Sequence, residues 1–158
     1  MDHNTQCRLL HAAKILTHLK SLGILAAVTG SVALFVHGMS RTKPPGDIDV
    51  VVWGTNGYEI RDSLVASNPN NYSIAANKLV YKHDEQSEGS VVELLCASSN
   101  ATLRWLQFGH NQVEEIEGIK MLTMGQLLRI SYQLPTPDCK IFALVEVSKE
   151  RKTRTMHS

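Results

Sequence analysis

Hydrophobic and polar positions follow one another along this chain in blocks that predict helices and short strands. The first block places apolar residues at the three- and four-residue spacing of one helix face, at Leu9, Ala13, Leu16 and Leu19. Gly23 follows at the position where such a helix would stop. The apolar run at residues 25–28 then predicts a strand, Thr29-Gly30-Ser31 predicts a tight turn, and residues 32–36 predict a short helix.

The rest of the pattern predicts further strands and helices. After the turn-forming residues 39–46, an apolar run at 48–53 that only Asp49 interrupts predicts a buried strand. Residues 58–66 then predict a helix. The other expected elements are strands at 73–82 and 90–96, joined as a hairpin by 83–89, a strand at 113–122, and helices at 124–134 and 139–149.

Length and composition predict a single domain. The chain has 158 residues, of which 43% are hydrophobic, and this is enough for one core. We expect one unit over residues 1–158, with the sheet and its helices in 1–122, C-terminal helices in 123–150 and a frayed tail in 151–158.

Net charge and cysteine content limit the partners and the structural sites that the sequence allows. The 16 Lys and Arg residues nearly balance the 15 Asp and Glu residues, so a long nucleic acid is not expected as a substrate. The three cysteines, Cys7, Cys96 and Cys139, match neither a disulfide framework nor a zinc site. Neither a secretory signal nor an apolar run of about 18 residues is apparent, so we expect a soluble cytoplasmic protein without a membrane partner.

The strand at residues 48–53 begins beside the acidic pair of Asp47-Ile48-Asp49. Because side chains alternate faces along a strand, Asp47 and Asp49 are expected on one side and Ile48 on the other. Two carboxylates so close repel each other unless a cation lies between them, and hard oxygen ligands favour Mg²⁺. The pair therefore predicts a divalent metal site, although such a pair also occurs in solvated loops.

Glu93 is an acidic residue within the apolar run 91–95. A charge in such a strand is expected to be paired or to bind metal. If its strand neighbours the strand of Asp49, Glu93 is a third metal ligand or a general base. The alternative is an edge strand on which Glu93 faces solvent and discourages aggregation.

Residues upstream of the acidic pair predict a place for phosphate groups. Gly30 lets backbone N–H groups approach phosphate oxygens, and Ser31 adds a hydroxyl at the start of a short helix. A turn glycine and an N-cap serine would also explain these two residues. Arg41 and Lys43 would contact the outer phosphates or remain solvated in their proline-rich loop.

The segments Thr29-Gly30-Ser31 and Asp47-Ile48-Asp49, followed by Glu93, resemble the signature of the nucleotidyltransferase superfamily, which has the polymerase-β-like fold. That signature is a Gly-Ser or Gly-Gly turn that opens a helix, two acidic residues one apart at the start of a strand, and a third acidic residue on a later strand. Residues 30–49 look most like the small-molecule antibiotic nucleotidyltransferases and the abortive-infection-type nucleotidyltransferases. The resemblance implies an α+β fold with a small mixed sheet, helices packed on one face and a helical C-terminus.

The resemblance also implies a reaction, its cofactor and its site. The reaction would move a nucleoside monophosphate from a nucleoside triphosphate such as ATP to a hydroxyl of a small molecule, an RNA end or a protein. The cofactor would be two Mg²⁺ ions, with Mn²⁺ as the alternative. The residues that would bind metal and act in catalysis are Asp47, Asp49 and Glu93, and those that would bind nucleotide are Thr29, Gly30, Ser31, Arg41 and Lys43.

Three departures from the family pattern keep a second interpretation open. The loop before Asp47 is longer than in the polymerase-like members, the third acid is Glu93 where Asp is commoner, and only two helices follow the sheet. Relatives usually carry a further helical domain that holds the acceptor. We therefore expect a second copy or another partner to complete the acceptor site, and the alternative function is a non-catalytic protein that binds a nucleotide or a protein partner.

Overall fold

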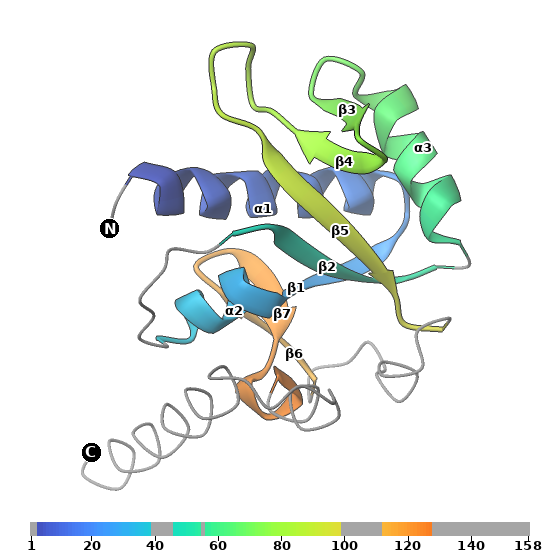
Figure 1. Ribbon diagram of the computed structural model, residues 1–158. Coiled ribbons are helices and arrows are strands. Elements are labelled where there is room, and N and C mark those ends of the chain that lie inside the picture. The colour runs from blue at the N-terminus through green and yellow to red at the C-terminus, as the bar shows by residue number, and fades with distance from the viewer. Residues whose placement is uncertain (1–2, 39–45, 55, 99–111, 128–158) are drawn as a thin grey trace, which may run out of the picture.

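One mixed sheet forms the centre of the protein (Figure 1). The computed structural model describes residues 3–38, 46–54, 56–98 and 112–127. Seven strands lie in this part of the chain: β1 (Leu25–Thr29), β2 (Ile48–Trp53), β3 (Tyr72–Ala75), β4 (Lys78–Tyr81), β5 (Ser90–Cys96), β6 (Val113–Ile116) and β7 (Ile119–Leu122). Their order across the sheet is β3-β4-β5-β2-β1-β7-β6. The predicted α+β fold with a mixed sheet is confirmed.

The two central strands are β1 and β2. They pair antiparallel with each other, while β2 pairs parallel with β5 and β1 pairs parallel with β7. Val50, Val51 and Val52 of β2 are all fully buried, so both faces of the strand are covered. This burial on both faces explains why the sequence of β2 is a continuous apolar run and not an alternating one.

Helix α1 (His3–Ser21) begins before the first of the apolar positions that predict it, and Gly23 ends it as expected. Gly23 has φ +76°, and its N–H donates to Lys20 O at 2.9 Å. The N–H of Ile24 donates to Leu19 O at 3.0 Å. This pair of hydrogen bonds is the Schellman motif, which satisfies the last helix carbonyls and needs a residue at positive φ.

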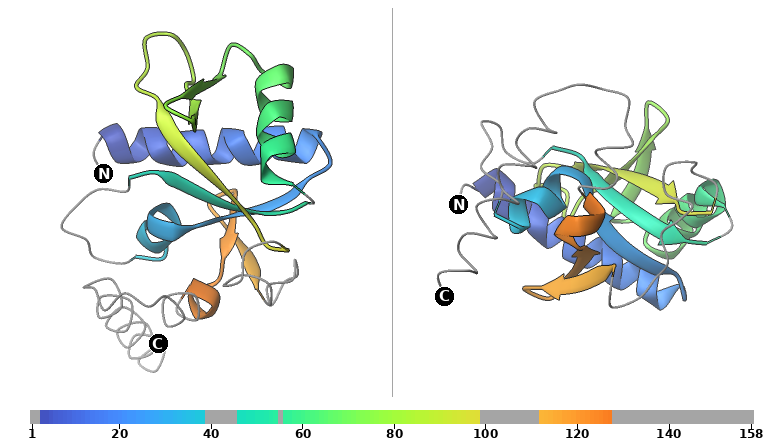
Figure 2. Two further views of the ribbon diagram at one scale, coloured as in Figure 1. Left: turned by 45° about the vertical axis from the view of Figure 1, so that its right-hand side comes forward. Right: turned by 90° about the horizontal axis from the view of Figure 1, so that it is seen from below.

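Helices α1 and α3 (Gly57–Ser67) cover the same face of the sheet. The side chain of His11 on α1 reaches Ser90 of β5, and a Cβ at Gly57 would lie 3.4 Å from Cys96 Sγ. Ser90 and Cys96 are an even number of residues apart, so their side chains share a face. Figure 2 shows α1 lying across the strands. Glu93, at an odd spacing from both, belongs to the opposite face.

A buried polar group joins α1 to β5. Nδ1 of His11 lies 2.5 Å from Ser90 Oγ, and Arg8 Nη1 donates to the same oxygen at 2.6 Å. The ring of His11 also packs edge-on against Tyr81, with 4.9 Å between ring centroids. Burial, followed by the nearby charge of Arg8, lowers the pKa of His11 to about 4. His11 is therefore neutral in the folded protein near pH 7.

The prediction of one strand over residues 73–82 is wrong, because this segment is a hairpin of β3 and β4. Ala75 pairs with Lys78, and the two residues between them, Ala76 and Asn77, have φ +51° and +63°. Two consecutive residues at positive φ form the tight turn that matches the twist of a hairpin. The predicted hairpin with the next strand is present as well, since β4 pairs antiparallel with β5.

The prediction of one strand over residues 113–122 is wrong for the same reason. Ile116 pairs with Ile119, and the intervening Glu117 and Gly118 have φ +52° and +80°. The chain therefore reverses between β6 and β7, and only β7 reaches the edge of β1. This reversal places both strands at one end of the sheet.

After β7, residues 124–127 are helical, as predicted for the start of a helix at residue 124. The N–H groups of Gln126 and Leu127 donate to Thr123 O at 3.1 and 3.0 Å. The rest of that helix, the helix expected at 139–149 and the tail at 151–158 lie outside the described residues. Among the helices that the structure describes, none has the length and apolar character that a membrane span requires.

Candidate functional site

Asp49 and Glu93 are neighbours on the sheet face opposite α1 and α3. They are register partners on the parallel strands β2 and β5, so their side chains leave the sheet on the same side. Asp49 is half-buried and Glu93 is exposed. On the other side of Asp49, its register partner is Thr29 at the end of β1. The condition that the sequence analysis set for a role of Glu93 in the site, a strand next to that of Asp49, is therefore met.

Gly30 lies directly against the side chain of Asp49. A Cβ added at Gly30 would overlap Asp49 Oδ2 and would lie 3.0 Å from Asp49 Cγ. Gly30 also has φ +68°, a backbone conformation that favours glycine. The Asp49 carboxylate and the main-chain turn can therefore lie this close together only because residue 30 is a glycine.

Helix α2 (Gly30–Val36) begins at this glycine and follows β1 without a break. Its N-cap is Thr29, which is buried and makes no side-chain capping hydrogen bond. The interpretation of Ser31 as an N-cap is therefore wrong, because Ser31 is the second residue of the helix. Ser31 Oγ instead forms a long hydrogen bond of 3.5 Å to the backbone carbonyl of Asp47. The Gly-Ser turn thus contacts the segment that carries both aspartates.

The structure does not gather all three acids into one metal-binding group. Asp47 is exposed and precedes β2 by one residue, and it lines the same cavity as Glu93. Across the described part of the chain, no three or more His, Cys, Asp or Glu side chains lie close enough to hold an ion. The oxygen donors of Asp47 and Asp49 still fit Mg²⁺ in kind, because this ion usually takes one or two carboxylates and completes its shell with water and substrate phosphates.

The two basic residues predicted to contact phosphate, Arg41 and Lys43, lie outside the described residues. Their role stays a prediction. Thr29, Gly30 and Ser31, the other residues predicted to bind nucleotide, lie together at the junction of β1 and α2 and beside the acids.

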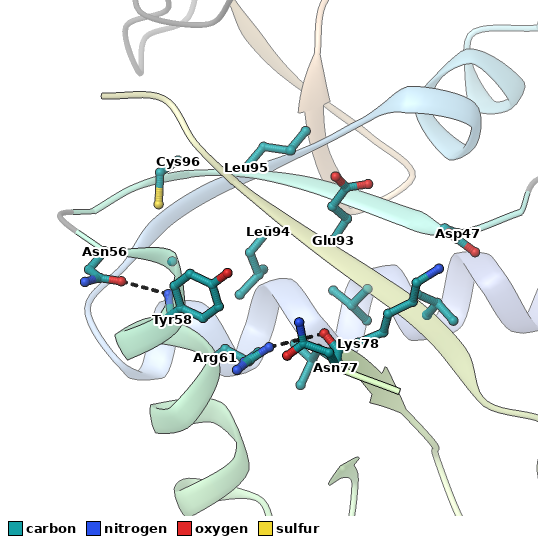
Figure 3. A pocket seen from close by; sticks show the side chains of 14 residues that line it. Asp47, Asn56, Tyr58, Arg61, Asn77, Lys78, Glu93, Leu94, Leu95 and Cys96 are labelled. Atoms are coloured by element: carbon teal, nitrogen blue, oxygen red, sulfur yellow. Dashed lines mark hydrogen bonds between the residues drawn. The ribbon is translucent and has the colours of Figure 1, made fainter. Parts of the chain in front are cut away.

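A cavity of about 820 Å³ adjoins Glu93 (Figure 3). Its walls come from the start of α3, the start of β4 and the outer edge of β5. β4 pairs with β5 only as far as Val92, whereas β2 pairs with β5 up to Cys96. The outer edge of β5 beyond Val92 is therefore free of a strand among the described elements, and the cavity occupies this edge.

The α3 side of the cavity is formed by Tyr58, Arg61 and the turn residue Asn77. The Arg61 guanidinium lies 4.9 Å from the centroid of the Tyr58 ring, and its Nη1 donates to Asn77 O at 3.4 Å. Arg61 Nε is buried and has no hydrogen-bond partner among the described residues. Tyr58 is 65% exposed, which is unusual for so large a ring and leaves one side open to a ligand.

Sequence reasoning missed this cavity. Tyr58 and Arg61 lie three residues apart, the spacing of neighbours on one helix face, so their contact could have been predicted once the helix was assigned. That they line one cavity with Glu93 could not be predicted, because it depends on where the strand at Lys78 begins to pair with β5. No local sequence pattern predicts that pairing.

Comparison with known proteins supports the fold alone. No protein-family model matches the sequence, and no curated protein matches it. The crystal structure of an antigenic nucleotidyltransferase-like protein from Paracoccidioides brasiliensis is similar, with a TM-score of 0.66 and 17% sequence identity over 89% of this chain and 72% of that one. The crystal structure of ANT(2")-Ia in complex with adenylyl-2"-tobramycin has a TM-score of 0.53 and 12% identity over 97% of this chain and 93% of that one. Together with the mixed sheet, these likenesses show that the chain has a nucleotidyltransferase-like fold.

Proposed function

We propose that this protein is a metal-dependent nucleotidyltransferase that moves a nucleoside monophosphate from a nucleoside triphosphate to a hydroxyl acceptor. The observation that carries the proposal is the contact of Gly30 with Asp49, together with the register pairing of Asp49 and Glu93. Gly30 places a main-chain turn against the carboxylate of Asp49, and the carboxylate of Glu93 lies one strand away. This arrangement is suited to binding a phosphate group and its cation.

The residues of the site have two tasks: some bind the triphosphate and its cation, and one accepts a proton. Asp49, with Asp47 beside it, would hold a divalent cation, whose chemistry when bound is to neutralise charge on the transferring phosphoryl group. Gly30 and Ser31 would place main-chain N–H groups and a hydroxyl against the triphosphate. Glu93 would orient the acceptor hydroxyl and accept its proton.

The proposal is tested by pyrophosphate release from each of the four common ribonucleoside triphosphates, with Mg²⁺ and a panel of hydroxyl acceptors. Asp49→Asn keeps the size of the side chain and removes its charge, so we expect turnover to fall by at least about a hundredfold. Asp62→Asn, on an exposed position of α3, is the matched control and should keep full activity. Equal turnover in the wild type and Asp49→Asn would exclude the proposed role of Asp49.

The absence of a three-carboxylate group among the described residues favours one second candidate, a protein that binds nucleotide without turnover. Calorimetry with a nucleoside triphosphate and Mg²⁺ separates the two functions. Affinity that depends on Asp49, without pyrophosphate release across the whole acceptor panel, would select the second.

A further inference from the structure

We propose that the cavity beside Glu93 is the acceptor site and that it takes a small hydroxyl compound carrying a phosphate or carboxylate group. This inference rests on the proposed function, because it assigns the acceptor for the same site. It concerns Tyr58, Arg61 and Lys78, which the sequence pattern did not point to.

The cavity joins the two faces of the sheet around the edge of β5 beyond Val92, which no described strand pairs with. Its lining includes Glu93 and Leu95, which face the acidic side, and Leu94 and Cys96, which face α3. A ligand in this cavity can therefore reach Glu93 with one end while its other end lies against α3. Figure 3 shows Glu93 and Arg61 on different walls of this space.

Arg61 and Lys78 are the two basic side chains of the cavity, whose lining also includes the carboxylates of Asp47 and Glu93. Arg61 is held by the Tyr58 ring and by Asn77 O, both of which are uncharged, and its Nε is unpaired. Lys78 begins β4 and is exposed beside the cavity. Within the described residues, neither Arg61 nor Lys78 forms an ion pair with a carboxylate. A planar guanidinium with unused donors is suited to a phosphate or a carboxylate.

Size and lining indicate a small molecule. A cavity of about 820 Å³ falls within the range of about 300–1,000 Å³ that small-molecule sites occupy. Leu94, Leu95 and the open side of the Tyr58 ring give it apolar walls against which a sugar or similar ring can pack.

The reaction balances with these residues. The acceptor oxygen forms a bond to the α-phosphorus of the nucleoside triphosphate, the bond from that phosphorus to the β-phosphate oxygen breaks, and pyrophosphate leaves. The hydroxyl proton goes to the carboxylate of Glu93. Arg61 holds the anionic group of the acceptor against α3 and so positions the hydroxyl near Glu93.

The test is an NMR titration of the full chain at pH 7 with ribose 5-phosphate, ribonate and neutral ribose, without nucleotide or metal. We expect the phosphate or the carboxylate compound to bind at least about tenfold more tightly than ribose. The amide shifts should centre on Tyr58, Arg61 and Leu95. The relative affinities of ribose 5-phosphate and ribonate identify which anion the site takes.

Three variants test whether Arg61 and Lys78 bind the anionic sugar. Arg61→Gln and Lys78→Gln should each weaken the anionic sugar by about three- to tenfold, whereas Lys20→Gln, an exposed lysine at the end of α1, should leave its affinity unchanged. Lys78 is exposed, so its variant tests the site even if Arg61→Gln impairs folding. Equal affinities for all three sugars, or affinities that neither variant changes, would overturn the proposal.

The outcome can be separated from that of the proposed function. If pyrophosphate release requires Asp49 but the anionic sugar shifts Gly30 and Ser31 in place of Arg61, the acceptor assignment fails and the transferase proposal stands. If the sugar binds at Arg61 but Asp49→Asn leaves pyrophosphate release unchanged, the cavity is a ligand site and the transferase proposal fails.

Discussion

At the scale of single residues, Gly30 carries two constraints that can be measured separately. Its positive φ disfavours any other residue, and its missing side chain leaves room for Asp49. Gly23 has nearly the same backbone conformation, with φ +76° against +68°, but a Cβ there would have nothing within 4 Å. The two glycines therefore form a natural pair for comparison.

We predict that Gly30→Ala and Gly23→Ala both lower the free energy of unfolding by about 1–2 kcal/mol, because both place alanine at positive φ. Gly30→Ala should lower it further and should also abolish Mg²⁺-dependent nucleotide affinity, since Asp49 must move to make room. Urea unfolding and calorimetry measure these two effects. Unchanged nucleotide affinity in Gly30→Ala would show that the Asp49 contact does not serve binding.

The sequence predicted this part of the site because its information is local. Glycine before a short helix and Asp49 in an apolar run are both visible in a few residues. The strand predicted at residues 48–53 also matches β2, and Asp47 is exposed directly before it. The place of Tyr58 and Arg61 beside the edge of β5 was not predicted, because it depends on pairing between strands that are distant in the sequence.

At the scale of elements, the hairpin turns show what a pattern of apolar residues leaves out. The β6–β7 turn contains Gly118, a usual signal, but the β3–β4 turn places Ala76 at φ +51° without any glycine. This turn lacks a glycine marker, so the pattern predicts residues 73–82 as one strand. Asn77, which tolerates positive φ, was the only local signal.

The unfavourable conformation of Ala76 leads to an element-scale prediction. Replacing Ala76-Asn77 by Asn-Gly matches the residue preference of a turn with two positive φ angles and should stabilise the protein by about 1 kcal/mol. The midpoint of urea unfolding should rise. The single change Asn77→Ala should lower it, and a rise in that variant would contradict the turn geometry.

At the scale of the whole molecule, the neutral His11 makes stability depend on pH. The pKa of His11 is lowered from 6.5 to about 4 in the folded state, so the unfolded chain binds a proton between these values and the folded protein does not. Stability is therefore complete above about pH 6.5, falls by roughly 1 kcal/mol per pH unit down to about pH 4, and levels off below it.

Urea unfolding at several pH values between 4 and 7 measures this dependence. His11→Asn removes the titrating ring, so the difference in slope between the wild type and this variant isolates one residue from other groups that titrate in the same range. We expect the variant to be less stable at pH 7, and its free energy of unfolding to change less with pH. Identical slopes would show that His11 is not the group responsible.

The pairing of Val28 in β1 with Met121 in β7 has a consequence for how the chain reaches this shape. β1 is synthesised early, but β7, which pairs with the edge of β1 that β2 does not occupy, is synthesised only after most of the other described elements. Until then β1 presents unpaired backbone groups, which attract other strands. Contacts between such distant parts of a chain form slowly. A ribosome-bound chain that stops before residue 119 should therefore need a chaperone to stay soluble, and the last sheet contacts should set the refolding rate.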